Sequence, residues 1–433
     1  MLIKNSKIWL SGSFYNMKKN AAVLISLLFF TTVLFSQNVP YVRGMIDTLA
    51  SFGFYGRGYV NHGDKIAADF IVKHLKKNKL KFFAQDTMQR FLLNVNTFPG
   101  ELELKINGFV KIPGTDYIVA PNSQTINRSY KALVLNEKTL CTPKLIKKFT
   151  KKKVSNIALV VDTGFKDMKN SKLQETPLLV IIRDKSISWH VSNEQIKKEY
   201  AEITIMRNAL PEKIKKVSVN IEAKQQDNYT TQNVIGYISG RVYPDSFIVF
   251  GAHYDHLGMM GSKTYFPGAN DNASGTAMSL DLSVYFSKPE NQPDYSMAFI
   301  FFSAEEAGLL GSEYYTEHPL FPLKNIKFML NLDMVGTGSE GIKVVNGSIF
   351  KPEFEKLKAL NEKGGYVKSV NERGEAANSD HYYFYKKGVK SFFIYTLGGE
   401  YKQYHTVGDK AAGLPLTKYT ELFRLVCDFV KNL

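Results

Sequence analysis

Phe247-Ile248-Val249-Phe250-Gly251-Ala252 is the stretch that decides the fold of this chain, and His253-Tyr254-Asp255-His256 follows it directly. The first six residues are an apolar run with the length of a buried β-strand. Polar side chains that come directly after such a strand lie at its C-terminal edge, where open α/β sheets place their sites. The stretch therefore predicts an α/β fold with a chemical site at this edge.

Two more buried-strand patterns end in carboxylates, one in Glu305-Glu306 and the other in Asp333. Between them and the first strand, a turn-rich segment before a helix, residues 267–275, places Asp271 on a loop. Neighbouring side chains on extended backbone point to opposite sides, so one of the two glutamates can bind a metal while the other faces a substrate water. Three strands that each end in a carboxylate or an imidazole indicate a metal site with a general base beside it.

The residue types favour zinc held by nitrogen and oxygen ligands. Two divalent metals about 3.5 to 4 Å apart need a bridging ligand, and a carboxylate can bridge them. Asp271 is the candidate, because a turn can hold it between ligands from different strands. His253 and His405 would each supply one nitrogen, and two cysteines are too few for a thiolate site. Asp255 lies on the same side of an extended segment as His253, where it can accept the other imidazole proton.

Five motifs resemble, in order and spacing, those of the di-zinc aminopeptidase family. They are Gly251-Ala252-His253-Tyr254-Asp255-His256, Gly268-Ala269-Asn270-Asp271-Asn272-Ala273-Ser274-Gly275, Ala304-Glu305-Glu306-Ala307-Gly308-Leu309-Leu310-Gly311-Ser312, Asn331-Leu332-Asp333-Met334 and Tyr404-His405-Thr406. The family includes bacterial leucyl aminopeptidase, glutamate carboxypeptidase, glutaminyl cyclase and the transferrin receptor ectodomain. The resemblance covers residues 230–433, with a weaker echo at 55–80.

The resemblance implies a role for each site residue. One zinc would take His253 and Asp333, the other would take Glu306 and His405, and Asp271 would bridge them. In addition, Glu305 matches the general base, and Asp255 matches the partner of His253. The implied protein is a zinc-dependent aminopeptidase with two Zn²⁺ per chain, which acts on peptides with a free N-terminus.

Other functions stay open at this stage. A carboxypeptidase or a glutaminyl cyclase could use the same scaffold, and cyclases of this family use a single zinc. A non-catalytic, receptor-like binding protein would lack some ligands, whereas all five are present here. The remaining histidines of interest, His256, His318 and His381, add no expected metal position and are interpreted as structural.

Asp380, which precedes His381, is interpreted as a carboxylate at the start of a helix. The alternative is that it supports a metal ligand without binding the metal itself. Tyr382, Tyr383 and Tyr385 could line a substrate pocket, although aromatic residues at this density are more often core. The sequon-like Asn272-Ala273-Ser274 lies inside a metal motif and is interpreted as coincidental.

The alternation of strand and helix patterns predicts an α/β fold, and the resemblance implies a mixed β-sheet sandwiched between helices. Residues 95–225 carry none of the site chemistry and consist of β-like runs separated by Pro, Gly, Asn and Lys, which predicts a β-rich inserted subdomain. Many family members carry a protease-associated domain at this place. The expected division is a leader and signal peptide at 1–36, the first part of the catalytic domain at 37–94, the insertion at 95–225 and the zinc peptidase domain at 226–433.

Periodicity places the individual elements. The expected helices are Asp64–Leu80, Pro352–Glu362, one from Ser379 to near Gly388, and Leu416–Lys431. Beyond the three strands that lead to the site, the expected strands are 102–106, 132–135, 157–161, 178–182, 217–221, 233–238, 342–345 and 390–395. Residues 240–245 are expected to turn the 233–238 strand toward the Phe247 strand.

The N-terminal region has the pattern of a secretory signal. Met17-Lys18-Lys19-Asn20 precedes a mostly apolar run, Ala21–Phe35, and then Ser36. The run is short for a membrane span, which needs about 20 residues, so an uncleaved anchor is the lesser alternative. The prediction is an exported protein, periplasmic or extracellular, without a further span.

A net charge of +16 raises the possibility of a nucleic-acid partner or an anionic surface. The lysines are spread along amphipathic patterns and no nucleic-acid motif accompanies them, which favours solvated helix faces and no nucleic-acid partner. The two cysteines, Cys141 and Cys427, could pair in an oxidising compartment, but their sequence separation cannot show that they meet. Cys427 lies in an apolar run and is interpreted as core.

Overall fold

The computed structural model describes residues 38–83, 86–135, 156–162, 176–193 and 200–433, and Pro40–Leu433 forms one compact unit. The predicted signal peptide and Cys141, with its proposed pairing, lie outside the described residues. Cys427 is buried as a free cysteine, as expected for a core residue. In the part of the chain that the structure describes, every helix is too short or too polar to cross a membrane.

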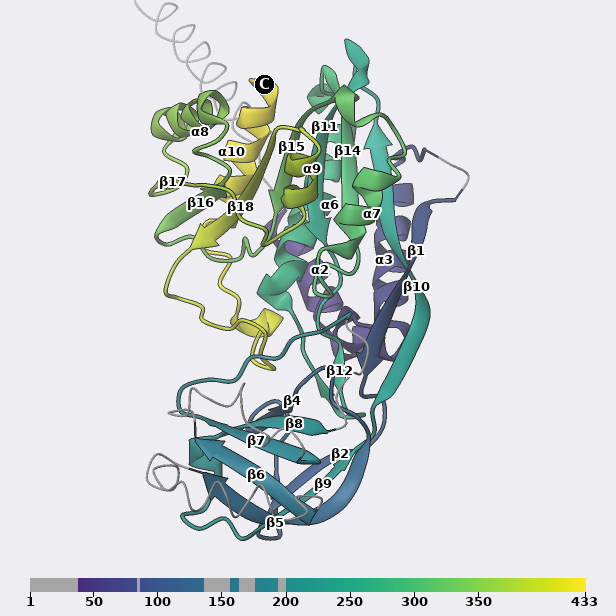
Figure 1. Ribbon diagram of the computed structural model, residues 1–433. Coiled ribbons are helices and arrows are strands. Elements are labelled where there is room, and N and C mark those ends of the chain that lie inside the picture. The colour runs from purple at the N-terminus through teal and green to yellow at the C-terminus, as the bar shows by residue number, and fades with distance from the viewer. Residues whose placement is uncertain (1–37, 84–85, 136–155, 163–175, 194–199) are drawn as a thin grey trace, which may run out of the picture. The chain divides into compact units, whose positions relative to one another are not determined.

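The main sheet has eight strands in the spatial order β1-β10-β14-β11-β15-β18-β16-β17 (Figure 1). Their bounds are β1 Met88–Thr97, β10 Lys224–Ile238, β11 Tyr243–His253, β14 Tyr295–Phe302, β15 Ile326–Leu332, β16 Gly341–Val345, β17 Val370–Arg373 and β18 Ser391–Leu397. The four central strands, β14, β11, β15 and β18, run parallel to their neighbours in that order. His253 pairs with Phe302 and Gly251 with Asn331, so these strands end at one edge of the sheet.

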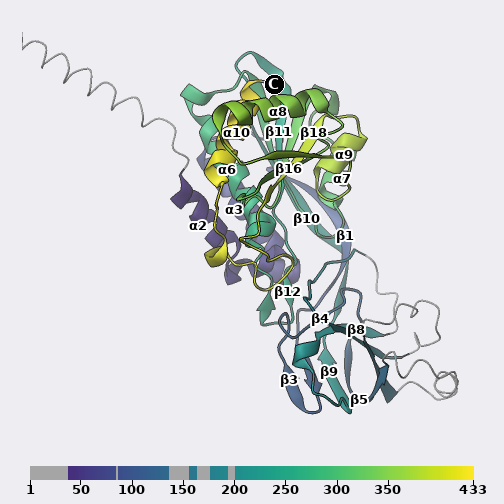
Figure 2. The same ribbon diagram turned by 90° about the vertical axis from the view of Figure 1, so that its left-hand side faces the viewer.

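Helices cover both faces of this sheet, as the edge-on view in Figure 2 shows. Their bounds are α2 Val39–Leu49, α3 Gly63–Lys77, α6 Gly275–Ser287, α7 Leu310–Glu317, α8 Lys351–Gly364, α9 His381–Lys386 and α10 Tyr419–Lys431. Helices α3, α6 and α10 pack on one face, while α7 and α9 pack on the other. On the α7 and α9 side, Tyr315 and Phe384 bury their rings against a core of strand residues that includes Phe247 and Phe302. The observed layers confirm the predicted α/β fold with a mixed sheet between helices.

A second eight-stranded sheet is built from residues 102–221, in the order β3-β2-β9-β5-β6-β7-β8-β4. Its strands are β2 Leu102–Ile106, β3 Phe109–Lys111, β4 Tyr117–Val119, β5 Ile126–Leu135, β6 Ile157–Asp162, β7 Leu178–Arg183, β8 Ala201–Met206 and β9 Lys216–Ile221. The chain enters it after β1 and leaves it into β10, two long strands that pair antiparallel with each other. One apolar cluster joins this sheet to the rest of the unit, since Trp189 packs with Phe98, Leu257 and Phe266.

Some elements differ from the prediction. The expected strands and helices are present with shifted ends, whereas seven of the elements described above were not predicted: β1, β3, β4, β8, β17, α2 and α7. The chain turns between β10, which ends at Ile238, and β11, which begins at Tyr243, but the two strands are not neighbours, because β14 lies between them. β14 pairs with both, antiparallel to β10 and parallel to β11, and no local pattern specifies that choice of neighbour. A short hairpin, β12 Met259–Met260 and β13 Thr264–Tyr265, follows β11.

Candidate metal centre

The five predicted metal ligands come together at the C-terminal edge of the parallel strands. His253 is the last residue of β11, Glu306 follows β14, and Asp333 follows β15. His405 lies in the loop after β18, and Asp271 lies in a π-helical turn, Ala269–Ser274, before α6. The site therefore lies where an open parallel sheet presents its strand ends.

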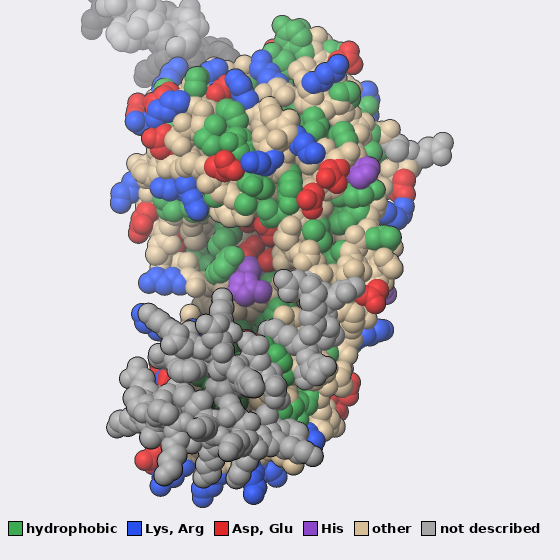
Figure 3. All heavy atoms as spheres, viewed as in Figure 1, with side chains coloured by type: hydrophobic (Ala, Val, Ile, Leu, Met, Phe, Trp, Pro, Cys, Tyr) green, Lys and Arg blue, Asp and Glu red, His purple; other side chains and the backbone are tan. Residues whose placement is uncertain are grey.

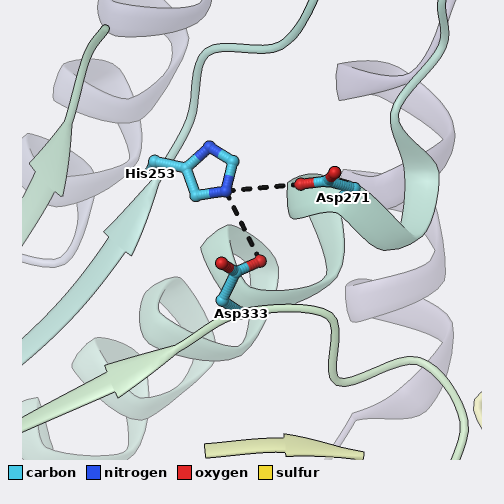
Figure 4. Close-up of side chains that lie close together, drawn as sticks. All are labelled: His253, Asp271 and Asp333. Atoms are coloured by element: carbon cyan, nitrogen blue, oxygen red, sulfur yellow. Dashed lines mark ion pairs between the residues drawn. The ribbon is translucent and has the colours of Figure 1, made fainter. Parts of the chain in front are cut away.

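His253 forms one half of the cluster together with two aspartates (Figure 4). Its Nε2 atom lies 3.4 Å from Asp271 Oδ1 and 3.4 Å from Asp333 Oδ1. Two atoms that each bind one zinc at 2.0 to 2.2 Å with a tetrahedral angle are about 3.3 Å apart. The three side chains are thus spaced as ligands of a common ion.

His405 forms the other half. Its Nε2 atom lies 3.0 Å from Asp271 Oδ2 and 3.1 Å from Glu306 Oε2. Asp271 therefore presents one oxygen to each histidine, which is the arrangement of a bridging carboxylate. His256, interpreted from sequence as structural, lies beside this half, with Nδ1 2.7 Å from Glu306 Oε1.

The two adjacent glutamates differ in their surroundings. Ala304, two residues after the end of β14, has a left-handed backbone with φ +58°, so the chain leaves the strand direction just before Glu305. The Glu306 side chain is 5% exposed between His405 and His256, whereas that of Glu305 is 13% exposed and its Oε2 lies 4.0 Å from His253 Nε2. Of the two, Glu305 has the freer carboxylate and is open to water.

Asp255 lies behind His253 and ties it to the glutamates. The Asp255 carbonyl oxygen is 3.2 Å from His253 Nδ1, while its carboxylate is farther away, at 3.7 Å. That carboxylate accepts hydrogen bonds from the backbone N–H groups of Glu305 and Glu306, at 3.2 and 3.4 Å. Asp255 thus orients the imidazole through its backbone and the glutamate pair through its side chain.

The loop of Asp271 is held by Asp409. The carboxylate of Asp409 accepts the backbone N–H groups of Asn270 and Asp271, at 2.9 and 3.1 Å. Gly268 begins this turn at φ +60°, and a side chain there would meet the His256 ring and the carbonyl oxygen of Asp271. Since Asp409 follows His405 in the same loop, the bridging residue and the second histidine are positioned together.

Arg57 is a fully buried cation beneath the site. Its guanidinium donates five hydrogen bonds, to the carbonyl oxygens of Leu49, Tyr254, Pro267, Gly268 and Asp271. Burial lowers its pKa to about 10, and nearby carboxylates oppose that shift. Neither Arg57 nor Asp409 was expected from the sequence. Asp409 lay within reach of the Tyr404-His405-Thr406 motif, but Arg57 carried no signal beyond the echo at 55–80.

The cluster concentrates negative charge in a buried place. Burial alone would lower the pKa of His405, but Glu306 and Asp271 raise it to about 11. Likewise, burial opposes protonation of His253, yet Glu305 and Asp333 hold its pKa well above the usual value. The site therefore stabilises positive charge at both histidine positions.

The ligand atoms in the described part of the chain are of the kinds that zinc binds. Asp333 Oδ1 is buried without a hydrogen-bond donor, and Glu306 Oε1 is buried with His256 Nδ1 2.7 Å away as its ion-pair partner. Imidazole nitrogens and carboxylate oxygens are ligands that zinc accepts. In the space-filling view, acidic side chains and a histidine are visible in a recess of this face (Figure 3).

The other residues singled out from sequence are not among the five candidate ligands, and they lie at different distances from them. His318 is exposed, with Nδ1 3.3 Å from the carbonyl oxygen of Tyr314. His381 is buried, and burial lowers its pKa to about 3. Asp380, at the start of α9, is buried near the ligands, and burial raises its pKa to about 7. The tyrosines of α9 are half-buried.

One further residue near the site was missed altogether. His190, which follows β7 in the second sheet, has its Nδ1 atom 3.1 Å from His405 Nδ1. No motif surrounds it, and 215 residues separate the pair. Sequence spacing could not have brought them together.

A family model described as peptidase family M28 matches residues 233–430. Among curated relatives, aminopeptidase YwaD of Bacillus subtilis (strain 168) is 35% identical over 178 residues, which are 40% of this chain and 37% of the relative. An aminopeptidase of Pseudomonas aeruginosa (strain UCBPP-PA14) is 30% identical over 227 residues, 50% of this chain and 39% of the relative. The chain thus spans less than two fifths of the length of these relatives.

Solved structures resemble nearly the whole chain. The zinc aminopeptidase BSAP from Bacillus subtilis superposes with a TM-score of 0.66 and 21% identity, over 92% of this chain and 95% of that one. At this identity the likeness shows the fold. The similarity extends over both sheets, since it covers more of the chain than the family model does.

Proposed function

We propose that this chain, in which residues 233–430 form a peptidase family M28 domain, is a zinc aminopeptidase that hydrolyses N-terminal residues from peptides at a two-zinc site. The observation that carries the proposal is the position of Asp271, whose oxygens face His253 and His405 at 3.4 and 3.0 Å. One carboxylate shared by two imidazoles supports a pair of ions more than a single one. Aminopeptidase names among the relatives support the reaction.

In this proposal His253 and Asp333 would hold one zinc, Glu306 and His405 would hold the other, and Asp271 would serve both. When bound, zinc supplies Lewis acidity, which eases deprotonation of water near pH 7 and polarises a carbonyl. The protein holds the ligands ready, because Asp255, Asp409 and Arg57 fix the backbone around them.

Glu305 is the general base in the proposed mechanism. Its carboxylate is close to His253 but is free to meet a water molecule, unlike that of Glu306. It takes the proton of the attacking water and returns it to the leaving amine as the peptide bond breaks. The proton thus ends on the new N-terminus, and Glu305 is regenerated.

Substrate selection would follow from the free N-terminus. The unprotonated α-amine of a peptide has a nitrogen lone pair with which it would sit at the metal pair. The nitrogen of an N-acetylated peptide is an amide without such a lone pair. The proposed activity is therefore exopeptidase cleavage from the N-terminus.

We also propose that the protein is exported from the cytoplasm. The basic start and apolar run at residues 17–36 support export to the periplasm or the outside of the cell. Determining the N-terminal sequence of the protein isolated from its cells tests this. A mature chain that begins near Gln37 is the expected result, and one that retains Met17 would contradict it.

The test of the proposed activity is zinc content together with hydrolysis of aminoacyl-p-nitroanilides and their N-acetylated forms. About two zinc ions per chain and cleavage only of free-amine substrates are expected. One zinc with cyclisation of an N-terminal glutamine would instead indicate the cyclase alternative. No zinc and no cleavage would indicate a binding role.

A further inference from the structure

Residues 184–190, which follow β7, form a short limb that reaches from the second sheet to the candidate metal centre. After β7 the chain buries Ile187 and Trp189 in the apolar cluster that joins this sheet to the rest of the unit. The Trp189 indole N–H donates to the Val119 carbonyl oxygen at 2.7 Å, and its ring stacks on Phe266 with centroids 4.8 Å apart. The limb is therefore anchored on both sides.

This limb holds the loop of the second metal histidine at two points. The Trp189 backbone N–H donates to the His405 carbonyl oxygen at 2.9 Å. His190 then places its Nδ1 atom 3.1 Å from His405 Nδ1, with ring centroids 4.9 Å apart. His405 itself has a left-handed backbone, with φ +54°, a conformation that its surroundings must stabilise.

The two nitrogens of His405 face different partners. Nε2 faces Asp271 and Glu306, at 3.0 and 3.1 Å, and Nδ1 faces His190. A neutral imidazole that gives its Nε2 lone pair to a metal carries its proton on Nδ1. That proton needs an acceptor, and His190 Nδ1 is in place to accept it.

We propose that His190 is a positioning residue that the second sheet contributes to the metal centre. Its Nδ1 atom accepts a hydrogen bond from the Nδ1–H of His405. This bond fixes the tautomer and the ring orientation in which His405 Nε2 would bind zinc. His190 then carries its own proton on Nε2. The inference rests on the proposed function, and it gives the second sheet a part in metal binding.

The test compares three variants of the whole chain. His190→Leu removes the acceptor, His190→Gln offers an amide oxygen in its place, and His318→Leu is a matched control at an exposed histidine outside the site. Zinc affinity is measured by competition with a chromophoric chelator at fixed pH. The absorption spectrum of cobalt-loaded protein reports the ligand geometry independently of activity.

Loss of a hydrogen-bond partner of a metal-binding histidine weakens metal binding by about 10- to 100-fold. Because His190 is exposed, we expect His190→Leu to weaken binding of the zinc at His405 about tenfold. His190→Gln should recover most of that affinity, His318→Leu should match the wild type, and the cobalt spectrum should change only for His190→Leu. Since His190 is exposed, the zinc-free proteins should melt at the same temperature, which separates this effect from unfolding.

Two outcomes would overturn the proposal. If His190→Leu holds two zinc ions as tightly as the wild type, His190 has no positioning role, while the proposed function stands. If His190→Gln is as weak as His190→Leu although both melt like the wild type, acceptance of the proton is not what His190 does. Failure of the wild type to bind zinc would instead remove the proposed function itself.

Discussion

The two histidines of the candidate metal centre are supported in opposite ways. His253 ends a central strand, is 1% exposed, and has its Nδ1 atom facing Asp255, two residues away. His405 lies in a loop, in a left-handed conformation, and its Nδ1 atom faces a residue 215 positions away in another sheet. One half of the site is thus local and belongs to the core, and the other half depends on distant contacts.

This difference shows what each half requires of the fold. In the His253 half, pairing of β11 with β14 and β15 brings Asp255 and Asp333 to the strand end where His253 lies, and the turn before α6 adds Asp271. The His405 half also needs the loop that ends at Asp409 and the anchored limb of Trp189. If the proposed site holds two zinc ions, we expect the ion at His405 and Glu306 to be bound more weakly, since more separate contacts must form to hold these residues.

The largest expected effect lies on the His253 half. Glu305→Gln keeps the size of the side chain but removes the base, so kcat should fall about 10²- to 10⁴-fold. Zinc content should stay at the wild-type value, because Glu305 is not among the proposed ligands. Steady-state kinetics and metal analysis measure the two quantities, with the exposed Glu317→Gln as the control. Near-normal turnover would remove Glu305 from this role.

The candidate ligands at strand ends were the easiest to predict. Polar residues directly after apolar strands form continuous patterns, so His253, Glu306 and Asp333 could be located from the chain alone, whereas Asp271 came from a turn pattern and His405 from the Tyr404-His405-Thr406 motif. The core strands were predictable for the same reason. β1 was missed because its residues alternate between buried and exposed positions rather than forming an apolar run.

What escaped prediction depends on contacts between distant segments. Arg57 is recognisable only through the carbonyl groups it bonds, which come from three separate segments of the chain. His190 is an exposed histidine in the segment after β7, which carries no site motif, and only folding brings it to His405. Patterns along the chain report local periodicity and turn chemistry, and neither specifies which distant surfaces pack together.

A second prediction concerns the core beneath the His253 half. Asp64 is buried and accepts hydrogen bonds from Tyr229 and Thr231, at 2.7 and 2.8 Å, and Thr231 meets Ser303 just after β14. Burial raises the Asp64 pKa from 3.8 to about 6, although these hydrogen bonds oppose the shift. The folded state therefore prefers the protonated carboxyl. The resulting stability is fully present below pH 3.8 and is lost as the pH rises through about 6.

A shift of this size corresponds to about 3 kcal/mol over the whole range, of which about 2 kcal/mol falls between pH 4 and pH 7. Asp64→Asn removes the titration, so its free energy of unfolding relative to the wild type should improve by that amount between these pH values. Urea denaturation of both zinc-free proteins measures it, and zinc affinity at pH 7 should not change. A difference that is independent of pH would show that Asp64 does not titrate between the folded and unfolded states.

The comparison of the two halves is tested most directly by removing each histidine's support. Asp255→Ala deprives the backbone N–H groups of Glu305 and Glu306 of their acceptor and loosens the turn whose carbonyl oxygen faces His253. We expect zinc affinity and kcat/KM to fall about 10- to 100-fold, whereas His190→Leu should cost about tenfold. Chelator competition on both variants, with the exposed Asp245→Ala as the control, gives the ratio. If His190→Leu costs more than Asp255→Ala, the local half is not the better supported one, because the contact from the second sheet would then outweigh the two hydrogen bonds that Asp255 accepts.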